Sequence, residues 1–376
     1  MIYLDYAAST PIAPEVIQAM LKCMQDQDAF ANPSSTHQYG QNAQALIHTA
    51  REQVADLINA KPTEIVFTSG ATEAINTALK GVIARCTGEC HIITSQIEHS
   101  AVLETCKHLG KQGVKITYLK PDSNGVIGPE QVSHALIPET KLVSLQSINN
   151  EVGAIQDIAA IGKLCLEHRV LFHIDAVQSV GKLPIDVQAQ NIDLLSLSAH
   201  KFYGPKGIGV LYVRNAPEVK LTPLIHGGSH EQGRRAGTLA THQIVGLGVA
   251  SELAKQHLST EPERLAKLRD QLWQEIKAIV PGVKLNGDFA STAPGILNVV
   301  LPGVDRDKLM RQVACATSSA CHSSNISASY VLLAMGVSVD AAKQSVRFSL
   351  GVKTTSAEIA EVALIIKACT KSVIAK

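Results

Sequence analysis

Strands that alternate with helices through the first two thirds of the chain constrain its fold more than any other feature. Short apolar runs predict strands at residues 64–68, 91–95, 115–119, 141–146, 170–174, 193–197 and 210–213. Helical patterns separate most of these runs, and a helix that joins two parallel strands must cross back over the sheet. The sequence therefore predicts an α/β fold, a mostly parallel sheet with helices on both faces.

The pattern changes beyond Thr238. The predicted order is two long helices at 241–257 and 262–279, strands at 283–285 and 295–301, a helix at 306–314, a polar stretch at 317–329, a helix at 330–335, a strand at 345–350 and a final helix at 356–374. This mixture predicts a smaller α+β domain. We place the large domain at 14–257, and the small domain at 1–13 and 258–376.

Composition excludes several classes of protein. The chain has 376 residues, a formal net charge of +1 and 4% aromatic residues, so neither a basic field nor a stacking platform for nucleic acid is expected. No apolar run is long enough for a membrane span, and the N-terminus lacks a signal-peptide pattern. The 8 cysteines are scattered, which favours reduced thiols and a cytoplasmic protein. Cys86 and Cys90 lack a second pair, so no intrinsic metal site is expected.

Lys201 stands where a predicted strand runs into a glycine-rich turn. Gly204, Gly207 and Gly209 follow it before the next apolar run. Such a turn opens at the edge of a sheet where ligands bind. A lysine held near apolar residues loses hydration, which lowers its pKa and suits it to Schiff-base chemistry. A solvated loop lysine is the alternative that this segment alone leaves open.

A second turn, Ser69-Gly-Ala-Thr72, joins the strand at 64–68 to a helix that runs on from Glu73. The first N–H groups of a helix are free and the helix dipole is positive there, so a phosphate is a natural ligand. An ordinary turn capped by Ser69 or Thr72 is the alternative. No Gly-Lys-Ser/Thr follows, so the turn is not a Walker motif.

Further polar residues follow predicted strands, among them His99, Asn150, Asp175, Gln178 and His200. Asp175 ends an apolar strand, where a partly buried acid needs a cationic partner unless it caps the next helix. A lysine, a phosphate turn and an aspartate at neighbouring strand ends fit one cofactor, pyridoxal 5′-phosphate. The carboxylate would keep the pyridine nitrogen protonated, so that the ring can accept electrons.

Short motifs run along nearly the whole chain: Tyr3-Leu-Asp-Tyr-Ala7, Asn32-Pro-Ser-Ser35, Thr68-Ser-Gly-Ala-Thr-Glu73, Glu98-His99, Asn149-Asn-Glu151, His173-Ile-Asp-Ala-Val-Gln-Ser179, Ala199-His-Lys-Phe-Tyr-Gly-Pro-Lys-Gly207, His226-Gly-Gly, Arg235-Ala-Gly-Thr238, Ser319-Ala-Cys321 and Val346-Arg-Phe-Ser-Leu-Gly351. In this order they resemble the cysteine desulfurases of the NifS/IscS type, within the class V pyridoxal-phosphate-dependent aminotransferases. The resemblance implies the type I aminotransferase fold, with a seven-stranded sheet in the large domain.

The resemblance also implies roles for individual residues. Lys201 would carry the cofactor, Asp175 would face its pyridine nitrogen, and His99 would stack on the ring and move protons. The residues assigned to the cofactor are Ala71, Thr72, Asn150, Asp175, Gln178, Ser198, His200, Lys201 and Thr238. Thr238 would reach the phosphate of the partner subunit, which implies a homodimer. Arg347 and Asn32 are assigned to substrate, since a guanidinium fork suits a carboxylate.

Cys321 matches the nucleophile of this family. Its neighbours, such as Ser319, Ala320 and Ser323, are small or polar, which favours an exposed loop at about 315–329. A protonated His322 would raise the fraction of thiolate. The alternative is an inert buried cysteine, which is our interpretation of Cys315. Cys321 could also transiently ligate a cluster iron.

The implied reaction removes sulfur from L-cysteine, leaving L-alanine and a persulfide on Cys321. An unidentified acceptor protein would then take the sulfur for iron–sulfur cluster assembly or tRNA thiolation. His322 follows Cys321 where threonine is common, and Ala320-Cys-His-Ser323 resembles selenocysteine lyases of the same superfamily. A selenocysteine lyase, a class V aminotransferase and a non-catalytic sulfur-relay scaffold are the alternatives.

Overall fold

The computed structural model describes residues 1–317 and 328–370. Its largest sheet has seven strands in the order β2-β8-β7-β6-β5-β3-β4. The strands are β2 (Ile65–Thr68), β3 (His91–Ser95), β4 (Lys115–Leu119), β5 (Thr140–Gln146), β6 (Leu171–Asp175), β7 (Leu194–Ser198) and β8 (Gly209–Val213). Only β8 runs antiparallel to its neighbours β2 and β7 in this sheet. The predicted α/β class with a mostly parallel seven-stranded sheet is confirmed.

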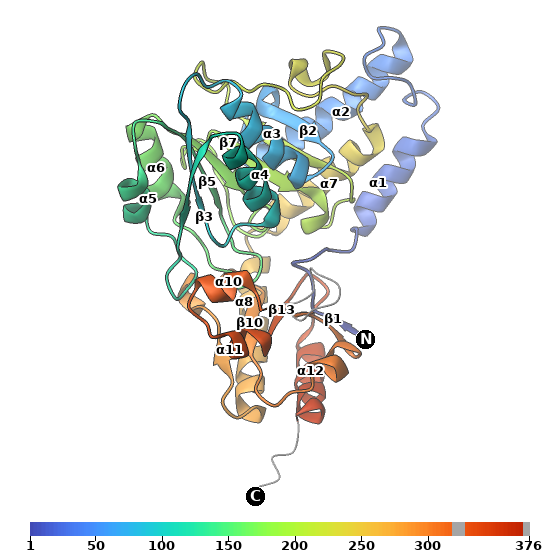
Figure 1. Ribbon diagram of the computed structural model, residues 1–376. Helices are drawn as coiled ribbons and strands as arrows, with labels where there is room; N and C mark the ends of the chain where they lie inside the picture. Colours follow the sequence, from blue (N-terminus) through green and yellow to red (C-terminus); the bar gives the residue numbers. More distant parts are fainter. Residues whose placement is uncertain (318–327, 371–376) are drawn as a thin grey trace, which may run out of the picture.

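Helices cover both faces of this sheet (Figure 1). On one face lie α3 (Ala71–Ile83) and α4 (Ser100–Lys111); on the other lie α1 (Pro14–Gln25), α2 (Gln38–Leu57), α5 (Pro129–Ala135), α6 (Ile158–His168) and α7 (Thr241–His257). Successive strand residues point to opposite faces. In β7, for example, Leu194 joins the cluster under α3, whereas Leu195 and Leu197 join the other cluster. The strands are therefore apolar throughout, as expected for a sheet buried on both sides.

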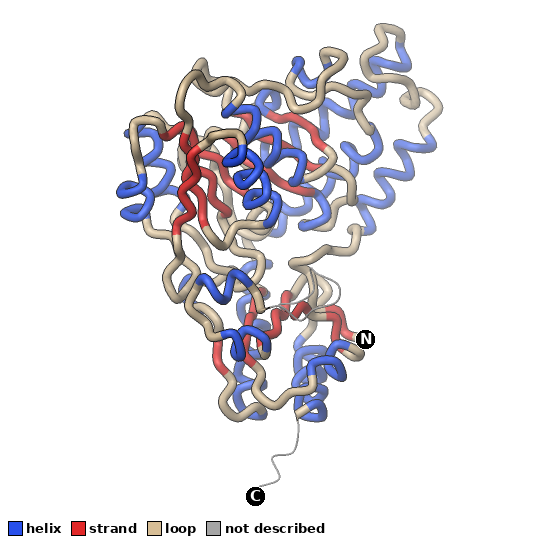
Figure 2. Tube along the Cα trace, in the orientation of Figure 1, coloured by secondary structure: helices blue, strands red, loops and turns tan. Residues whose placement is uncertain are grey.

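The remaining sheet elements form a second unit, below the large sheet in Figures 1 and 2. Its four-stranded sheet has the order β12-β13-β10-β9. The strands are β9 (Lys284–Leu285), β10 (Ile296–Val300), β12 (Ala316–Thr317) and β13 (Ser345–Ser349), and the main helices are α8 (Glu261–Ile279) and α12 (Ser356–Cys369). Ile2 and Leu4 share its apolar cluster with residues between 265 and 369. The domain boundaries given above stay a prediction.

The expected helix at 306–314 is wrong in its second half. Helix α9 (Arg306–Met310) ends early, and β11 (Val313–Ala314) pairs in parallel with β1 (Ile2–Tyr3). The helix was predicted from the spacing of neighbouring apolar residues alone. The pairing of β11 with β1 joins segments more than three hundred residues apart, and local spacing does not reveal it. This pairing brings the first residues of the chain to β13, where Asp5 bridges Ser349.

The short helices α10 (Tyr330–Ala334) and α11 (Val339–Lys343) pack against loops that follow β3 and β5. Ser329 Oγ donates to Glu151 at 2.5 Å, and the Tyr330 hydroxyl donates to the carbonyl of Glu98 at 2.6 Å. The chain therefore re-emerges after residue 327 beside the end of β5. Within residues 1–317 and 328–370, no helix combines the length and the apolar character that a bilayer crossing needs.

Candidate active site

Lys201 lies at the carboxyl-terminal edge of the large sheet, in a 3₁₀ turn (Ala199–Lys201) directly after β7. Its Nζ donates to the carbonyls of Ala7 and Ala8 at 2.9 and 2.8 Å. Loss of hydration, with a further contribution from nearby Arg347, lowers the pKa of Lys201 to about 8. A much larger share of this amine is therefore unprotonated near neutral pH than of a solvated lysine, which supports the predicted nucleophilic role.

Tyr203, which the sequence analysis did not single out, fixes the turn that carries Lys201. Its φ is 68°, an uncommon conformation for a residue with a side chain. Thr10 Oγ1 accepts from the backbone N–H of Tyr203 at 2.7 Å, and Val352 N–H donates to the tyrosine oxygen at 2.8 Å. Segments from both ends of the chain thus hold this strained residue in place, as strained residues at functional sites require.

Asp175 ends β6, next to β7 in the sheet, and its side chain is buried. One carboxylate oxygen accepts from Val177 N–H at 3.0 Å, and among the described residues it forms no ion pair. Burial raises the pKa of Asp175, while that N–H, His99 and Lys201 oppose the rise. A carboxylate in this state is stabilised by a cation or an N–H⁺ group brought to it by a ligand.

His99 caps α4, and its Nδ1 accepts from Ala101 N–H at 3.1 Å. This bond engages Nδ1, and no hydrogen bond to Nε2 is found among the described residues. Reduced hydration lowers the pKa of His99, opposed by Asp175. The lowered pKa favours the neutral imidazole, which can take a proton. Glu98, just before it, is fully buried with both oxygens unpartnered, and burial raises its pKa well above the usual range.

The start of α3 lies where the sequence predicts an anion cradle. The first bond of the helix runs from Ala74 N–H to Gly70 O, so the N–H groups of Ala71 and Thr72 precede it. Gly70 has a φ of 153°, and a Cβ there would lie 3.9 Å from Ser198 Oγ. Ser198, at the end of β7, therefore lies beside the first turn of α3, and the phosphate site stays a prediction.

His200 and Thr238 are the other two residues assigned to the phosphate. His200 Nδ1 is 3.2 Å from Ser9 Oγ, and desolvation with nearby Lys201 lowers the pKa of His200 to about 4. Arg235 Nε bonds Glu73 Oε1 at 3.0 Å, which ties the segment that carries Thr238 to the first turn of α3. Thr238 itself is exposed in this chain.

Gln178 and Asn150 share bonding partners with Lys201 and Arg347. Gln178 is buried, and its Nε2 donates to Ala7 O at 2.8 Å, the carbonyl that also accepts from Lys201. Asn150 presents its backbone oxygen to Arg347 Nη1 at 2.7 Å. Both residues therefore join the same group of contacts as Lys201 and Arg347.

Arg347 projects from β13 toward this site. Its Nη2 bonds Asp5 at 2.7 Å, while its Nε is buried and has no partner. An unpartnered guanidinium N–H is costly unless a ligand supplies an acceptor, which fits a substrate carboxylate. Asp5 was missed, because no local pattern links residues 342 positions apart.

Asn32 is not joined to this group. It is exposed, and its side chain accepts from Ser34 N–H at 2.9 Å, which closes its own turn. No hydrogen bond links it to the other candidate residues within the described chain. Cys321 lies outside the described residues. The residues before and after its segment both lie near Arg347, because Ala316 pairs with Arg347 in the sheet and Ser329 bonds Glu151.

The donor set fits pyridoxal 5′-phosphate. The cradle supplies N–H groups for a dianion, Asp175 is a buried carboxylate without a cation, and Lys201 is an amine with a lowered pKa. Each group lacks the partner that one part of this cofactor would provide. A metal is not needed to explain the site, and the described residues contain no cluster of three metal-ligating side chains.

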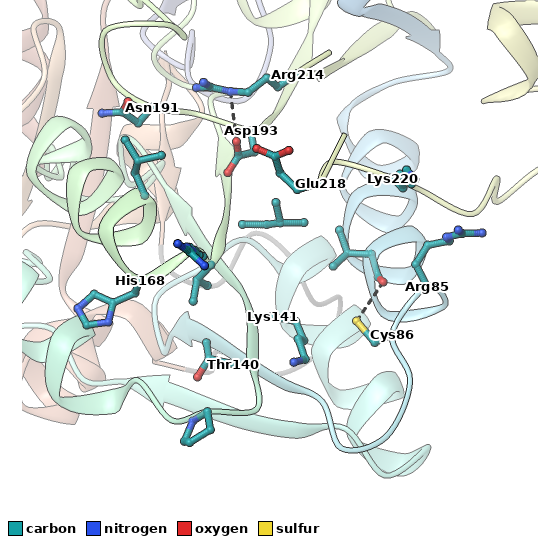
Figure 3. A pocket seen from close by; sticks show the side chains of 16 residues that line it. Arg85, Cys86, Thr140, Lys141, His168, Asn191, Asp193, Arg214, Glu218 and Lys220 are labelled. Atoms are coloured by element: carbon teal, nitrogen blue, oxygen red, sulfur yellow. Dashed lines mark hydrogen bonds and ion pairs between the residues drawn. The ribbon is translucent and has the colours of Figure 1, made fainter. Parts of the chain in front are cut away.

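A large cavity of about 760 Å³ lies at the opposite edge of the sheet (Figure 3). There Arg214 pairs with Asp193 at 3.2 Å, and Glu218 lies beside them. The thiol of Cys86 donates to the carbonyl of Val82 at 3.4 Å. None of the candidate residues lines this cavity, so its size does not identify the candidate active site.

Comparison with known proteins agrees with this arrangement. The model of the family described as "Aminotransferase class-V" matches residues 2–362. Cysteine desulfurase IscS from Shewanella oneidensis is 51% identical over 364 residues, 95% of this chain and 90% of that protein. The Aeromonas hydrophila protein of the same name is 49% identical over 363 residues, with the same coverage.

Solved structures agree as well. A NifS-like protein superposes with a TM-score of 0.89 at 35% identity, covering 98% of both chains. SspA in complex with cysteine superposes with a TM-score of 0.83 at 42% identity, covering 93% of this chain and 99% of that one. The chain belongs to the class V aminotransferase family, in the branch of the NifS-like and IscS cysteine desulfurases.

Proposed function

We propose that this protein is a pyridoxal-phosphate-dependent cysteine desulfurase that converts L-cysteine to L-alanine and transfers the sulfur atom to Cys321. The observation that carries the proposal is the meeting of Lys201, Asp175 and the α3 cradle at one sheet edge, with Arg347 facing them from the small domain. The relatives named cysteine desulfurase support the reaction, and the complex of SspA with cysteine supports the substrate.

The bound cofactor supplies an electron sink for the carbon atoms of the substrate. Lys201 would hold the cofactor through its amine, and the same amine would take and return protons at the substrate α-carbon. Asp175 would keep a proton on the pyridine nitrogen of the cofactor. His99, whose pKa is lowered by burial, would supply a second proton-transfer group.

Arg347 binds the substrate carboxylate, which aims the thiol of L-cysteine toward the segment with Cys321. The Cys321 thiolate attacks the substrate sulfur, so an S–S bond forms while the substrate C–S bond breaks and its electron pair goes to carbon. Protonation of that carbon gives L-alanine. In sum, L-cysteine and a protein thiol become L-alanine and a protein persulfide.

We further propose a cytoplasmic homodimer in which Thr238 completes the partner's phosphate site. The exposure of Thr238 and the bond from Arg235 to the first turn of α3 support this role. A sulfur-acceptor protein would take the persulfide sulfur, and the name IscS of the relatives favours iron–sulfur cluster assembly.

Incubation of the loaded protein with L-cysteine tests the proposal. Alanine and a persulfide on Cys321 are expected in equal amounts in a single turnover without acceptor. Cys321→Ser should keep the cofactor and lose persulfide formation. If Cys321→Ser makes alanine from L-selenocysteine at the wild-type rate and the wild type leaves L-cysteine intact, the protein is a selenocysteine lyase. Amino transfer to a keto acid without sulfur release would indicate an aminotransferase.

A further inference from the structure

A second lysine, Lys182, lies behind the site and has no place in the reaction above. It follows β6 by a turn in which Gly181 has a φ of 74°, and a Cβ on Gly181 would approach Phe202 Cβ to 2.9 Å. This close contact, which only glycine permits, seats Lys182 against the turn of Lys201. The side chain of Lys182 is partly buried.

The Lys182 amine has one close partner, the side-chain oxygen of Gln178, at 2.6 Å. Across residues 1–317 and 328–370 it forms no ion pair with a carboxylate. Burial lowers the pKa of Lys182 to about 7, and the positive charges of Lys201 and Arg347 add to this effect. A buried lysine without an ion pair costs stability, so its position beside Gln178 calls for a functional explanation.

The chemistry of the neighbours fixes how the Gln178 amide is turned. The Lys182 ammonium can only donate, so it requires the amide oxygen. Ala7 O can only accept, and it receives the amide nitrogen at 2.8 Å. The two neighbours therefore agree on one orientation. A side-chain amide has two N–H groups, and no described residue takes the second, which is left for an acceptor within the site.

We propose that Lys182 is a positioning residue, which holds the Gln178 amide with its oxygen outward so that its free N–H donates to the phenolic oxygen of the bound cofactor. This inference rests on the proposed function, because it needs the cofactor at Lys201. It assigns to Lys182 no contact with cofactor or substrate. Without Lys182, the amide oxygen lacks its donor and the amide can rotate away from the site.

Cofactor affinity and the absorption spectrum at a fixed pH test the proposal without any turnover. Lys182→Met should weaken pyridoxal-phosphate binding about two- to tenfold, the effect of one hydrogen bond. The ratio of visible to near-ultraviolet absorption should fall, since the N–H stabilises the ionised phenolic oxygen. Gln178→Glu, which keeps a partner for Lys182 but loses the N–H, should show the same spectral change. Lys206→Met, which removes an exposed cation from the loop between β7 and β8, is the control and should change neither quantity.

The double variant decides between action through Gln178 and a separate effect. In a Gln178→Ala background, Lys182→Met should change neither affinity nor spectrum further. The same loss in both backgrounds would overturn the proposal, as would a wild-type spectrum in Lys182→Met. Thermal unfolding identifies a variant that fails to fold, and Lys182→Gln, which keeps an N–H donor and should keep the wild-type spectrum, then carries the test. A wild-type protein that binds no cofactor would instead contradict the proposed function.

Discussion

Asp175 ends strand β6, and Asp193 directly precedes the neighbouring parallel strand β7. The two carboxyl groups therefore lie at opposite ends of adjacent strands. Burial raises the pKa of both carboxyl groups. Asp193, just before β7, bonds Arg214 at 3.2 Å and accepts from Phe172 N–H at 2.9 Å. Asp175, at the end of β6, has one N–H donor and no ion pair among the described residues.

The difference between Asp193 and Asp175 shows how a buried carboxylate with a structural role can be told from one with a functional role. At the edge with Asp193, the chain itself supplies the cation, and Arg214 also donates to the carbonyls of Val187 and Ile192. At the edge with Asp175, several groups lack a partner that the chain could have supplied, including Arg347 Nε. Buried polar groups without a partner, and not the cavity beside Asp193, therefore mark the end of the sheet that binds ligands.

Replacing each of the two aspartates in turn gives the largest expected difference between the two ends of the sheet. Asp175→Asn should lower alanine formation about a hundredfold or more, because the pyridine nitrogen loses its anion, with little change in the free energy of unfolding. Asp193→Ala should leave the rate per folded molecule unchanged and lower the free energy of unfolding by about 1–3 kcal/mol. Steady-state kinetics and urea unfolding of both variants measure this. Similar losses of activity in the two variants would remove the distinction.

The two arginines sharpen the same contrast. Arg347→Lys should raise the KM for L-cysteine about ten- to a hundredfold, since the fork that meets the carboxylate is lost. Arg214→Lys should leave KM unchanged and lower the urea midpoint, because it loses bonds to Asp193 and two carbonyls. An unchanged KM in Arg347→Lys would mean that the carboxylate binds elsewhere.

The smallest effect concerns the stability of the cofactor-free protein. The pKa of Lys201 is lowered to about 8, so the folded state holds this proton less tightly than the unfolded chain does. This cost is complete below about pH 8 and disappears as the pH rises toward the unfolded value. Lys201→Met should therefore raise the free energy of unfolding at pH 7 by about 1 kcal/mol after allowance for solvent screening, and by less at pH 10.

Lys220→Met, at the rim of the opposite cavity, is the control for this prediction. Lys220 is exposed, so its loss should leave stability unchanged at both pH values. A lower stability of Lys201→Met at pH 7 would show that its bonds to Ala7 and Ala8 outweigh the cost of burial.

Local patterns predicted much of the architecture and the residues of the sheet edge. Lys201, Asp175 and the α3 turn each follow a strand, and parallel strands bring their carboxyl ends together by topology alone. The contacts that tune these residues were not predictable in the same way. Asp5 meets Arg347 across 342 positions, and Glu151 meets Ser329 across 178. The position of Lys182 behind Gln178 depends on a tight turn that no periodic pattern reveals.

The central claim is that Lys201, at the edge with Asp175, holds the cofactor. Borohydride reduction of the protein with pyridoxal 5′-phosphate fixes the cofactor to its lysine, and peptide mass spectrometry then identifies that residue. Lys182 is a stringent competitor, because its pKa is lowered as well. We predict the label on Lys201, and its loss in Lys201→Ala. A label on Lys182 or on a lysine of the opposite edge, or no label at all, would contradict the account.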